Sequence, residues 1–217
     1  MPGATRIIAI RHGETAWNVD TRLQGHLDIG LNARGQWQAA RAAEALAEED
    51  LAAIYSSDLA RASATAQAIA DKSTRLVARQ VRLNTGLRER GFGIFEGQTY
   101  AQIASEWPQE SARWRQREPH FAPQGGESLV QVRDRIAATV NALASQHMGE
   151  QIVLVAHGGV MDALYRLATR QEIASPRTWD LGNAAINRLL WTPDGLSLVG
   201  WSDTRHLDDA TLDETST

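Results

Sequence analysis

The feature that most constrains this chain is an apolar segment that ends in a histidine and glycine, and it occurs twice. Residues 7–10 (Ile-Ile-Ala-Ile) run directly into Arg11 and His12, and residues 151–156 (Gln-Ile-Val-Leu-Val-Ala) run into His157. Continuous apolar runs of this length are typical of the buried strands of a parallel sheet. Because α/β sheets bind ligands at the carboxyl ends of such strands, we expect the two histidines to face each other.

The residues around the first histidine have the chemistry of an anion site. Arg11 supplies a cation, His12 supplies a possible nucleophile, and Gly13 leaves backbone N–H groups uncovered, all within three positions. Either histidine taken alone is equally well explained as a hydrogen-bonded residue of a turn. Partners from other segments are therefore needed to favour a ligand site.

Two further segments supply such partners. Residues 53–57 are strand-like and lead into an alanine-rich helix with Arg61 in or near its first turn, where free helix N–H groups face the same crevice. Glu89 lies between two arginines, ahead of a glycine-rich loop. Phosphoryl transfer through a histidine needs a nucleophilic imidazole, cationic donors for the phosphoryl oxygens and a proton donor for the leaving oxygen. The residues therefore indicate a phosphate site.

At this point the chain resembles the histidine phosphatase superfamily, which includes the cofactor-dependent phosphoglycerate mutases. The matching segments, in the family's order, are RHGET at 11–15, WN at 17–18, RLQG at 22–25, LNARG at 31–35, SSDLARA at 56–62, LRE at 87–89, GGES at 125–128 and HGG at 157–159. The segment HLD at 206–208 is similar to the terminus of bacterial phosphatases of this group. Ordered motifs over nearly the whole chain are far more specific than one short pattern.

The resemblance implies a role for each matching residue. His12 is the nucleophile, and Arg11, Arg61 and His157 form the cationic pocket that stabilises the transferring phosphoryl group. Glu89 is the general acid, which protonates the leaving oxygen and later takes a proton from the attacking water. Phosphate and substrate contacts are expected from Thr15, Asn18, Gln24, Gly25 and Gly158.

Two of these roles have structural alternatives. Arg61 is also compatible with an ordinary surface salt bridge. Glu89 is compatible with a structural ion pair if the side chains of Arg88 and Arg90 point toward it, because they would keep its carboxyl group ionised. Trp17 either lines the pocket or only packs beside the motif.

Strand-like and helix-like segments alternate along the chain. This pattern predicts an α/β fold, a three-layer α/β/α sandwich with a mostly parallel central sheet. Helices are expected from a cap at Asn32, over residues 59–70, from a capping box at Ser128 to near Gly149, and over residues 158–167.

The remaining segments complete this single domain, expected over residues 1–217. Strand-like runs at 185–191 and 196–201 flank a turn and predict an antiparallel edge. Residues 99–124 are irregular and predict a small helical lid insertion. The acidic, apolar-poor tail from about residue 208 is expected to be mobile.

The lid carries three arginines at alternate positions. Either Arg113, Arg115 and Arg117 form a second anion pocket, or they lie on an exposed helix face. The second interpretation is favoured, because alternate residues of a helix do not point the same way.

Composition narrows the possible functions. The 217 residues contain no cysteine, which excludes disulfides, thiolate metal sites and cysteine-based phosphatase chemistry. A net charge of −4 disfavours nucleic-acid binding, and no segment approaches the roughly 20 apolar residues of a membrane span. A cytoplasmic monomer or homodimer without a cofactor is expected. A metal site is also not expected, because none of the other histidines has ligand spacing; these are His26, His120, His147 and His206.

Three functions follow from this sequence. The favoured one is a metal-independent phosphomonoesterase that acts on a small phosphorylated metabolite through a phosphohistidine at His12. A phosphoglycerate mutase would use the same pocket, but residues 90–97 (Arg-Gly-Phe-Gly-Ile-Phe-Glu-Gly) are similar to the phosphatase branch and lack the His-Tyr-Gly pattern of mutases. A non-catalytic module that binds phosphorylated ligands is disfavoured by the intact set of candidate catalytic residues. The identity of the substrate is not encoded in these motifs.

Overall fold

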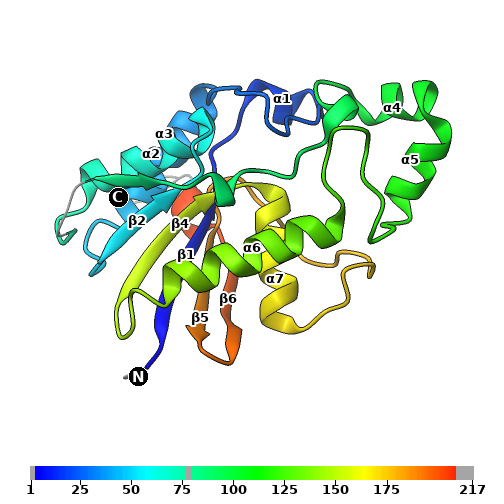
Figure 1. Cartoon of the computed structure of the whole chain (residues 1–217). Helices are drawn as coiled ribbons and strands as arrows, with labels where there is room; N and C mark the ends of the chain where they lie inside the picture. Colours follow the sequence, from blue (N-terminus) through cyan, green and yellow to red (C-terminus); the bar gives the residue numbers. More distant parts are fainter. Residues whose placement is uncertain (1–2, 77–79, 209–217) are drawn as a thin grey trace, which may run out of the picture.

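The central sheet has six strands in the order β3-β2-β4-β1-β5-β6 in the computed structural model, which describes residues 3–76 and 80–208. Strands β1 to β4 run parallel, whereas β5 is antiparallel to both β1 and β6 (Figure 1). The expected α/β fold with an antiparallel edge is therefore confirmed. The strands are β1 (Thr5–Arg11), β2 (Ala53–Ser56), β3 (Val81–Leu83), β4 (Gln151–Ala156), β5 (Ile186–Thr192) and β6 (Gly195–Asp203).

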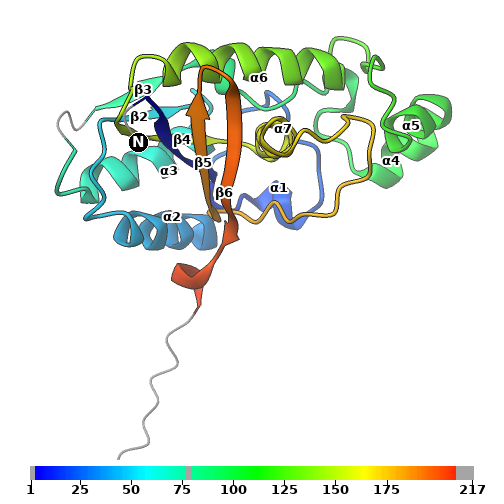
Figure 2. The ribbon, with the colours of Figure 1, turned by 90° about the horizontal axis from the view of Figure 1, so that it is seen from below.

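Helices cover both faces of the sheet, and Figure 2 shows α6 on one side and α2 on the other. Helices α4 and α5, in the segment that was predicted to form a lid, lie beyond one end of the sheet. The helices are α1 (Ala16–Val19), α2 (Ala33–Ala45), α3 (Ala60–Lys72), α4 (Tyr100–Glu106), α5 (Pro108–Arg115), α6 (Leu129–Ala144) and α7 (Gly158–Thr169). All four helices expected from periodicity and caps are present.

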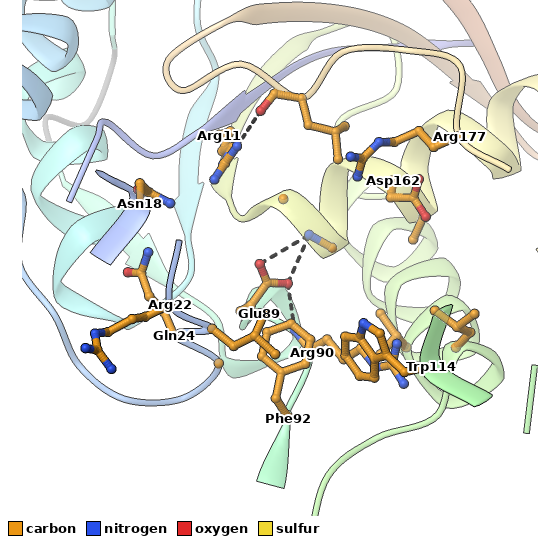
Figure 3. A pocket seen from close by; sticks show the side chains of 18 of the residues that line it. Arg11, Asn18, Arg22, Gln24, Glu89, Arg90, Phe92, Trp114, Asp162 and Arg177 are labelled. Carbon is orange, nitrogen blue, oxygen red and sulfur yellow. Dashed lines mark hydrogen bonds between the residues drawn. The ribbon is translucent and has the colours of Figure 1, made fainter. Parts of the chain in front are cut away.

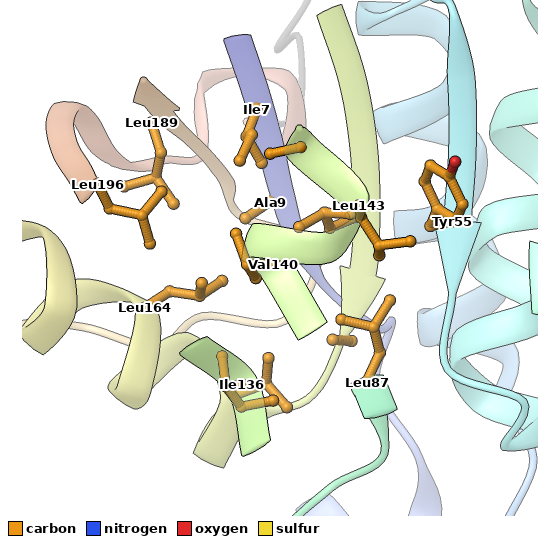
Figure 4. Packing of buried hydrophobic residues seen from close by; sticks show 14 of the residues in the cluster. Ile7, Ala9, Tyr55, Leu87, Ile136, Val140, Leu143, Leu164, Leu189 and Leu196 are labelled. Carbon is orange, nitrogen blue, oxygen red and sulfur yellow. The ribbon is translucent and has the colours of Figure 1, made fainter. Parts of the chain in front are cut away.

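The core forms two layers because side chains alternate across each strand. Ile7 and Ala9 of β1 pack in one cluster with α6 and α7 (Figure 4). Ile8 and Ile10 pack on the opposite face against α2 and α3. A strand that is buried on both faces needs apolar residues at every position, which explains the continuous apolar run in the sequence.

The register of β1 and β4 places the two histidines side by side. Arg11 pairs with Ala156, and the N–H of His12 donates to the carbonyl of Ala156 at 3.0 Å. The next residues, His12 and His157, therefore leave neighbouring strands at the same level. Parallel pairing alone is enough to bring these distant positions together.

Local caps set where the main helices begin. The side chain of Asn32 accepts the N–H of Gly35 at the start of α2, and Ser128 with Gln131 forms the expected capping box of α6. The predicted end of α6 near Gly149 is wrong, because the helix ends at Ala144. Gly149 instead occupies a left-handed turn, with φ of 84°, ahead of β4.

A third apolar cluster joins residues 99–124 to neighbouring segments. Phe95, Ile103 and Phe121 are buried together, and Trp107 and Trp114 pack against them. No helix among residues 3–76 and 80–208 is long and apolar enough to cross a membrane. The expected mobile tail lies outside the described residues from position 209 onward.

Candidate active site

The two histidines lie next to each other at the carboxyl ends of β1 and β4. Their ring centroids are 5.2 Å apart, with the ring planes tilted by 60°. Both side chains are buried. His157 also sits at the N-cap position of α7, so the first turn of that helix begins directly beside the pair. The expectation that the histidines face each other is confirmed.

The ring of His12 is held in an orientation that suits a nucleophile. Its Nδ1 lies 2.6 Å from the carbonyl oxygen of Gly13, a contact in which Nδ1–H is the donor. This hydrogen bond leaves the lone pair on Nε2. Burial, together with the positive charges of Arg11 and Arg61, holds the pKa of His12 well below its usual value. The imidazole is therefore neutral and able to attack an electrophile.

His157 is similarly neutral but differently placed. Burial, and then the neighbouring His12 ring and arginines, lower its pKa well below the usual value. Neither ring nitrogen has a hydrogen-bond partner among the described residues. His157 does not line the cavity wall as His12 does, but lies against the His12 ring. A buried imidazole without partners is costly unless a ligand completes its hydrogen bonds.

The two inner arginines are built into the fold. Arg11 donates to the carbonyl of Leu181, and Arg61 donates to the carbonyls of Leu27 and Gly25 at 2.9 and 2.7 Å. Burial lowers the pKa of both guanidinium groups. Because Arg61 is fully buried, it does not form a surface salt bridge.

Two backbone N–H groups in the segments predicted to bind an anion are already hydrogen-bonded. The N–H of Ala60 at the start of α3 donates to Asp28 at 2.6 Å and is not free for an anion. The N–H of Gly13 donates to Thr65 at 3.1 Å. Gly13 is required for another reason, because a Cβ there would overlap the carbonyl of Gly35.

Glu89 is held by backbone donors (Figure 3). Its carboxylate accepts the N–H of Gly159 at 3.0 and 3.2 Å and the N–H of Arg90 at 2.8 Å. Arg88 turns away to pair with Asp58. The Arg90 guanidinium stacks on a tryptophan of the lid and donates to a backbone carbonyl. Neither neighbouring arginine forms an ion pair with Glu89, which removes that alternative.

A cavity of about 470 Å³ opens in front of these groups. It brings together most of the predicted site residues, and its wall includes Arg11, His12, Asn18, Gln24, Gly25, Arg61, Glu89 and Gly158. Trp17 also lines it. Thr15 does not, because its buried hydroxyl caps α1 and contacts Asn18 Oδ1 at 3.1 Å.

The cavity holds no cluster of metal-ligating side chains. Within residues 3–76 and 80–208, no group of three or more His, Cys, Asp or Glu residues lies together as a metal site requires. The positive charge of the site comes from guanidinium groups.

The comparisons with known proteins agree with this geometry. The family model for the histidine phosphatase superfamily (branch 1) matches residues 7–204. The chain belongs to the histidine phosphatase superfamily. Phosphoglycerate mutase-like protein 4 of Arabidopsis thaliana is 37% identical over 206 residues, covering 94% of this chain and 87% of the relative. The metal-independent phosphoserine phosphatase of the same plant is 36% identical, covering 94% and 83%.

A solved structure shares the fold of this histidine phosphatase closely. Mycobacterial glucosyl-3-phosphoglycerate phosphatase, in complex with VO3, has a TM-score of 0.80 at 37% identity, covering 92% of this chain and 99% of that one. The expected family is confirmed, and with it the expected class of enzyme, a phosphoric monoester hydrolase.

The outer wall of the histidine phosphatase pocket contains one arginine that the favoured interpretation of the sequence placed on the surface and one that no motif indicates. Arg117 was expected on an exposed helix face, and this expectation is wrong. The residue follows α5 in a left-handed conformation, with φ of 54°, and donates to Asp162 at 3.0 Å inside the cavity. Arg113 and Arg115 are exposed, as expected. Arg177, from the loop after α7, also lines the cavity, and no motif marks it.

Proposed function

We propose that this histidine phosphatase hydrolyses small phosphate monoesters through a phosphohistidine on Nε2 of His12. The observation that carries the proposal is the placement of the His12 ring. The ring is buried and is fixed through Nδ1 by Gly13, and burial together with the positive charges of Arg11 and Arg61 lowers its pKa, which keeps it neutral. A neutral imidazole flanked by fixed cations is suited to receive a phosphoryl group.

In the first step, Nε2 of His12 attacks phosphorus while the bond from phosphorus to the leaving oxygen breaks. The leaving oxygen takes a proton from the Glu89 carboxyl group and departs as an alcohol. In the second step, water attacks the phosphohistidine and gives a proton to the Glu89 carboxylate. The P–N bond breaks, inorganic phosphate leaves, and the lone pair returns to Nε2.

The other pocket residues bind the phosphoryl oxygens in this proposal. The guanidinium groups of Arg11 and Arg61 offset the negative charge, and His157 donates a hydrogen bond from its otherwise unpartnered ring. Side-chain amides and backbone groups complete the binding; these come from Asn18, Gln24, Gly25 and Gly158. Thr15 acts indirectly, by positioning Asn18.

The relatives support this proposal. The named substrates of two of them, phosphoserine and glucosyl-3-phosphoglycerate, are small phosphorylated compounds. One is named as metal-independent, in keeping with a pocket whose charge comes from arginines. A small metabolite as substrate also fits the cytoplasmic location expected from the sequence.

The test is to replace the nucleophile and to trap the intermediate. His12→Ala should lower turnover of p-nitrophenyl phosphate by more than about a thousandfold, because it removes the group that accepts the phosphoryl group in the proposed first step. Rapid quenching of the wild-type enzyme should yield acid-labile phosphate on His12. His120→Ala, at an exposed position outside the cavity, is the matched control and should keep full activity. Label on another residue, or near-normal turnover by His12→Ala, overturns the proposal.

A further inference from the structure

The cavity carries more positive charge than a phosphate monoester requires. Two acidic residues line it, Glu89 and Asp162. Eight arginines line it as well: Arg11, Arg22, Arg61, Arg90, Arg117, Arg133, Arg166 and Arg177. Arg11 and Arg61 lie beside His12, where the phosphoryl group binds. Apart from Arg133, which forms an ion pair with Asp134, the arginines farther out therefore need another explanation.

The outer wall contains a group of arginines that other residues hold in place. A single oxygen of Asp162, Oδ2, accepts both from Arg117 and from Arg166 at 3.0 Å. One carboxylate thus balances two guanidinium groups and leaves one positive charge in excess. Arg166 is buried, and its remaining donors reach the carbonyls of Glu172 and Ser175. The arrangement fixes Arg117 in place, because Arg117 also donates to the carbonyl of Ile173.

Arg177 adds a second charge and has no such partner. Among the described residues it makes neither a hydrogen bond nor an ion pair, although its side chain points into the cavity (Figure 3). It lies across the cavity from Arg22 and Gln24, on the side of Asp162. Its planar fork of donors is therefore available to a ligand. Guanidinium forks match the two oxygens of a carboxylate.

Arg177 lines the same cavity as Arg11, and its charge acts on both Arg11 and Arg117. Burial is the main cause of the lowered pKa of Arg11, and the charge of Arg177 lowers that pKa further. The same charge also contributes to the lowered pKa of Arg117, although burial is again the larger cause. A small molecule that is bound at Arg11 through its phosphate therefore lies within the field of Arg177.

We propose that Arg177 and Arg117 bind a carboxylate on the leaving group, so that the substrates are phosphate monoesters of small hydroxy acids. This inference rests on the proposed function, because it assumes that the phosphate lies at His12. The ligand must bridge two anion sites within one cavity of about 470 Å³, which favours a short carbon chain between phosphate and carboxylate.

Two esters with the same carbon skeleton test the proposal. 3-Phosphoglycerate carries a carboxylate where glycerol 3-phosphate carries a hydroxymethyl group. The wild-type enzyme should release phosphate from 3-phosphoglycerate with a kcat/KM about 10- to 100-fold higher, as expected for charge-assisted hydrogen bonds to one carboxylate. Arg177→Gln should remove most of this preference, chiefly through KM. It should lower kcat/KM for glycerol 3-phosphate far less than kcat/KM for 3-phosphoglycerate, because only the second ester has the carboxylate.

Arg115→Gln is the matched control, since Arg115 is an exposed lid arginine outside the cavity. It should leave both esters unaffected. Equal effects of Arg177→Gln on the two esters overturn the inference, because they show a structural role. Glycerol 1,3-bisphosphate provides a third arm. If Arg177→Gln weakens turnover of the bisphosphate but not of 3-phosphoglycerate, the outer site binds phosphate and the inference is wrong. If the wild-type enzyme releases phosphate from none of these esters, the proposed function itself is refuted.

Discussion

The backbone N–H of Gly159 donates to both carboxylate oxygens of Glu89, at 3.0 and 3.2 Å. Gly159 lies in the first turn of α7, two residues after His157, so the helix that begins at the second histidine also holds the proposed acid. A Cβ at position 159 would overlap Glu89 Oε1. The position of the Glu89 carboxylate therefore depends on a glycine on a different element.

Replacing that glycine should displace the acid without removing it. We expect Gly159→Ala to lower kcat for alkyl phosphates by about 10- to 100-fold, because small misplacements of a catalytic group are costly. Steady-state rates with glycerol 3-phosphate measure the effect. Gly200→Ala is the control, since a Cβ at position 200 meets no atom within 4 Å. Equal activity of the two variants would show that the contact between Gly159 and Glu89 has no catalytic importance.

The buried histidines make stability depend on pH. The pKa values of His12 and His157 are lowered by burial, so below about pH 6.5 the unfolded chain binds protons that the folded chain does not. The free energy of unfolding should therefore be constant above that pH and fall as the pH drops below it. Each histidine contributes up to about 1.4 kcal/mol per pH unit.

Urea unfolding at pH 8, 7, 6 and 5 measures this dependence. His206, whose pKa burial also lowers, adds to the slope in the wild-type protein. His157→Gln should make the decline below pH 6.5 shallower by about one proton, whereas His120→Gln should not change it. An unchanged slope in His157→Gln would contradict the buried neutral state of this ring.

Metal removal should not affect catalysis. Arg11 and Arg61 are fixed beside His12 and supply the charge that a divalent ion supplies in metal-dependent phosphatases. Phosphate release from p-nitrophenyl phosphate should therefore be the same before and after incubation with EDTA. Activity that disappears with EDTA and returns with Mg²⁺ or Zn²⁺ would rule out this mechanism.

The part of the site around the two histidines could be predicted from the sequence, because its residues come directly after strands. His12 and His157 come directly after β1 and β4, and the parallel register brings them together. The wall that selects the leaving group follows no such rule. Arg117 enters the cavity through a left-handed residue after α5, and Arg177 enters from the loop after α7. Neither conformation has a periodic signal, so the helix pattern placed Arg117 on the surface.

The expected backbone anion contacts show the same limit. Helix starts and glycines predict exposed N–H groups, but side chains that are distant in sequence fill two of these positions. Asp28 accepts from Ala60, and Thr65 accepts from Gly13. Tertiary hydrogen bonds of this kind depend on how the loops pack, and the local sequence does not determine that packing.

Hydrolysis should exceed phosphoglycerate isomerisation. A mutase must keep water from its phosphohistidine, whereas the lid of this chain consists of the two short helices α4 and α5. With 3-phosphoglycerate and catalytic 2,3-bisphosphoglycerate supplied, phosphate release from p-nitrophenyl phosphate should be easier to detect than formation of 2-phosphoglycerate. Efficient isomerisation with negligible hydrolysis would identify a mutase instead.

The choice of leaving group can show whether Glu89 acts as a general acid or only positions other groups. A general acid matters most for a poor leaving group, because a good one departs without a proton. Glu89→Gln preserves size and can still accept the N–H of Gly159, but it has no carboxyl proton to give. It should slow hydrolysis of glycerol 3-phosphate much more than hydrolysis of p-nitrophenyl phosphate.

Glu106→Gln, at an exposed position at the end of α4, is the matched control. If Glu89→Gln slows both esters equally, the residue only positions the phosphate or its arginines. The proton must then come from elsewhere, and His157 is the next group to test by the same comparison.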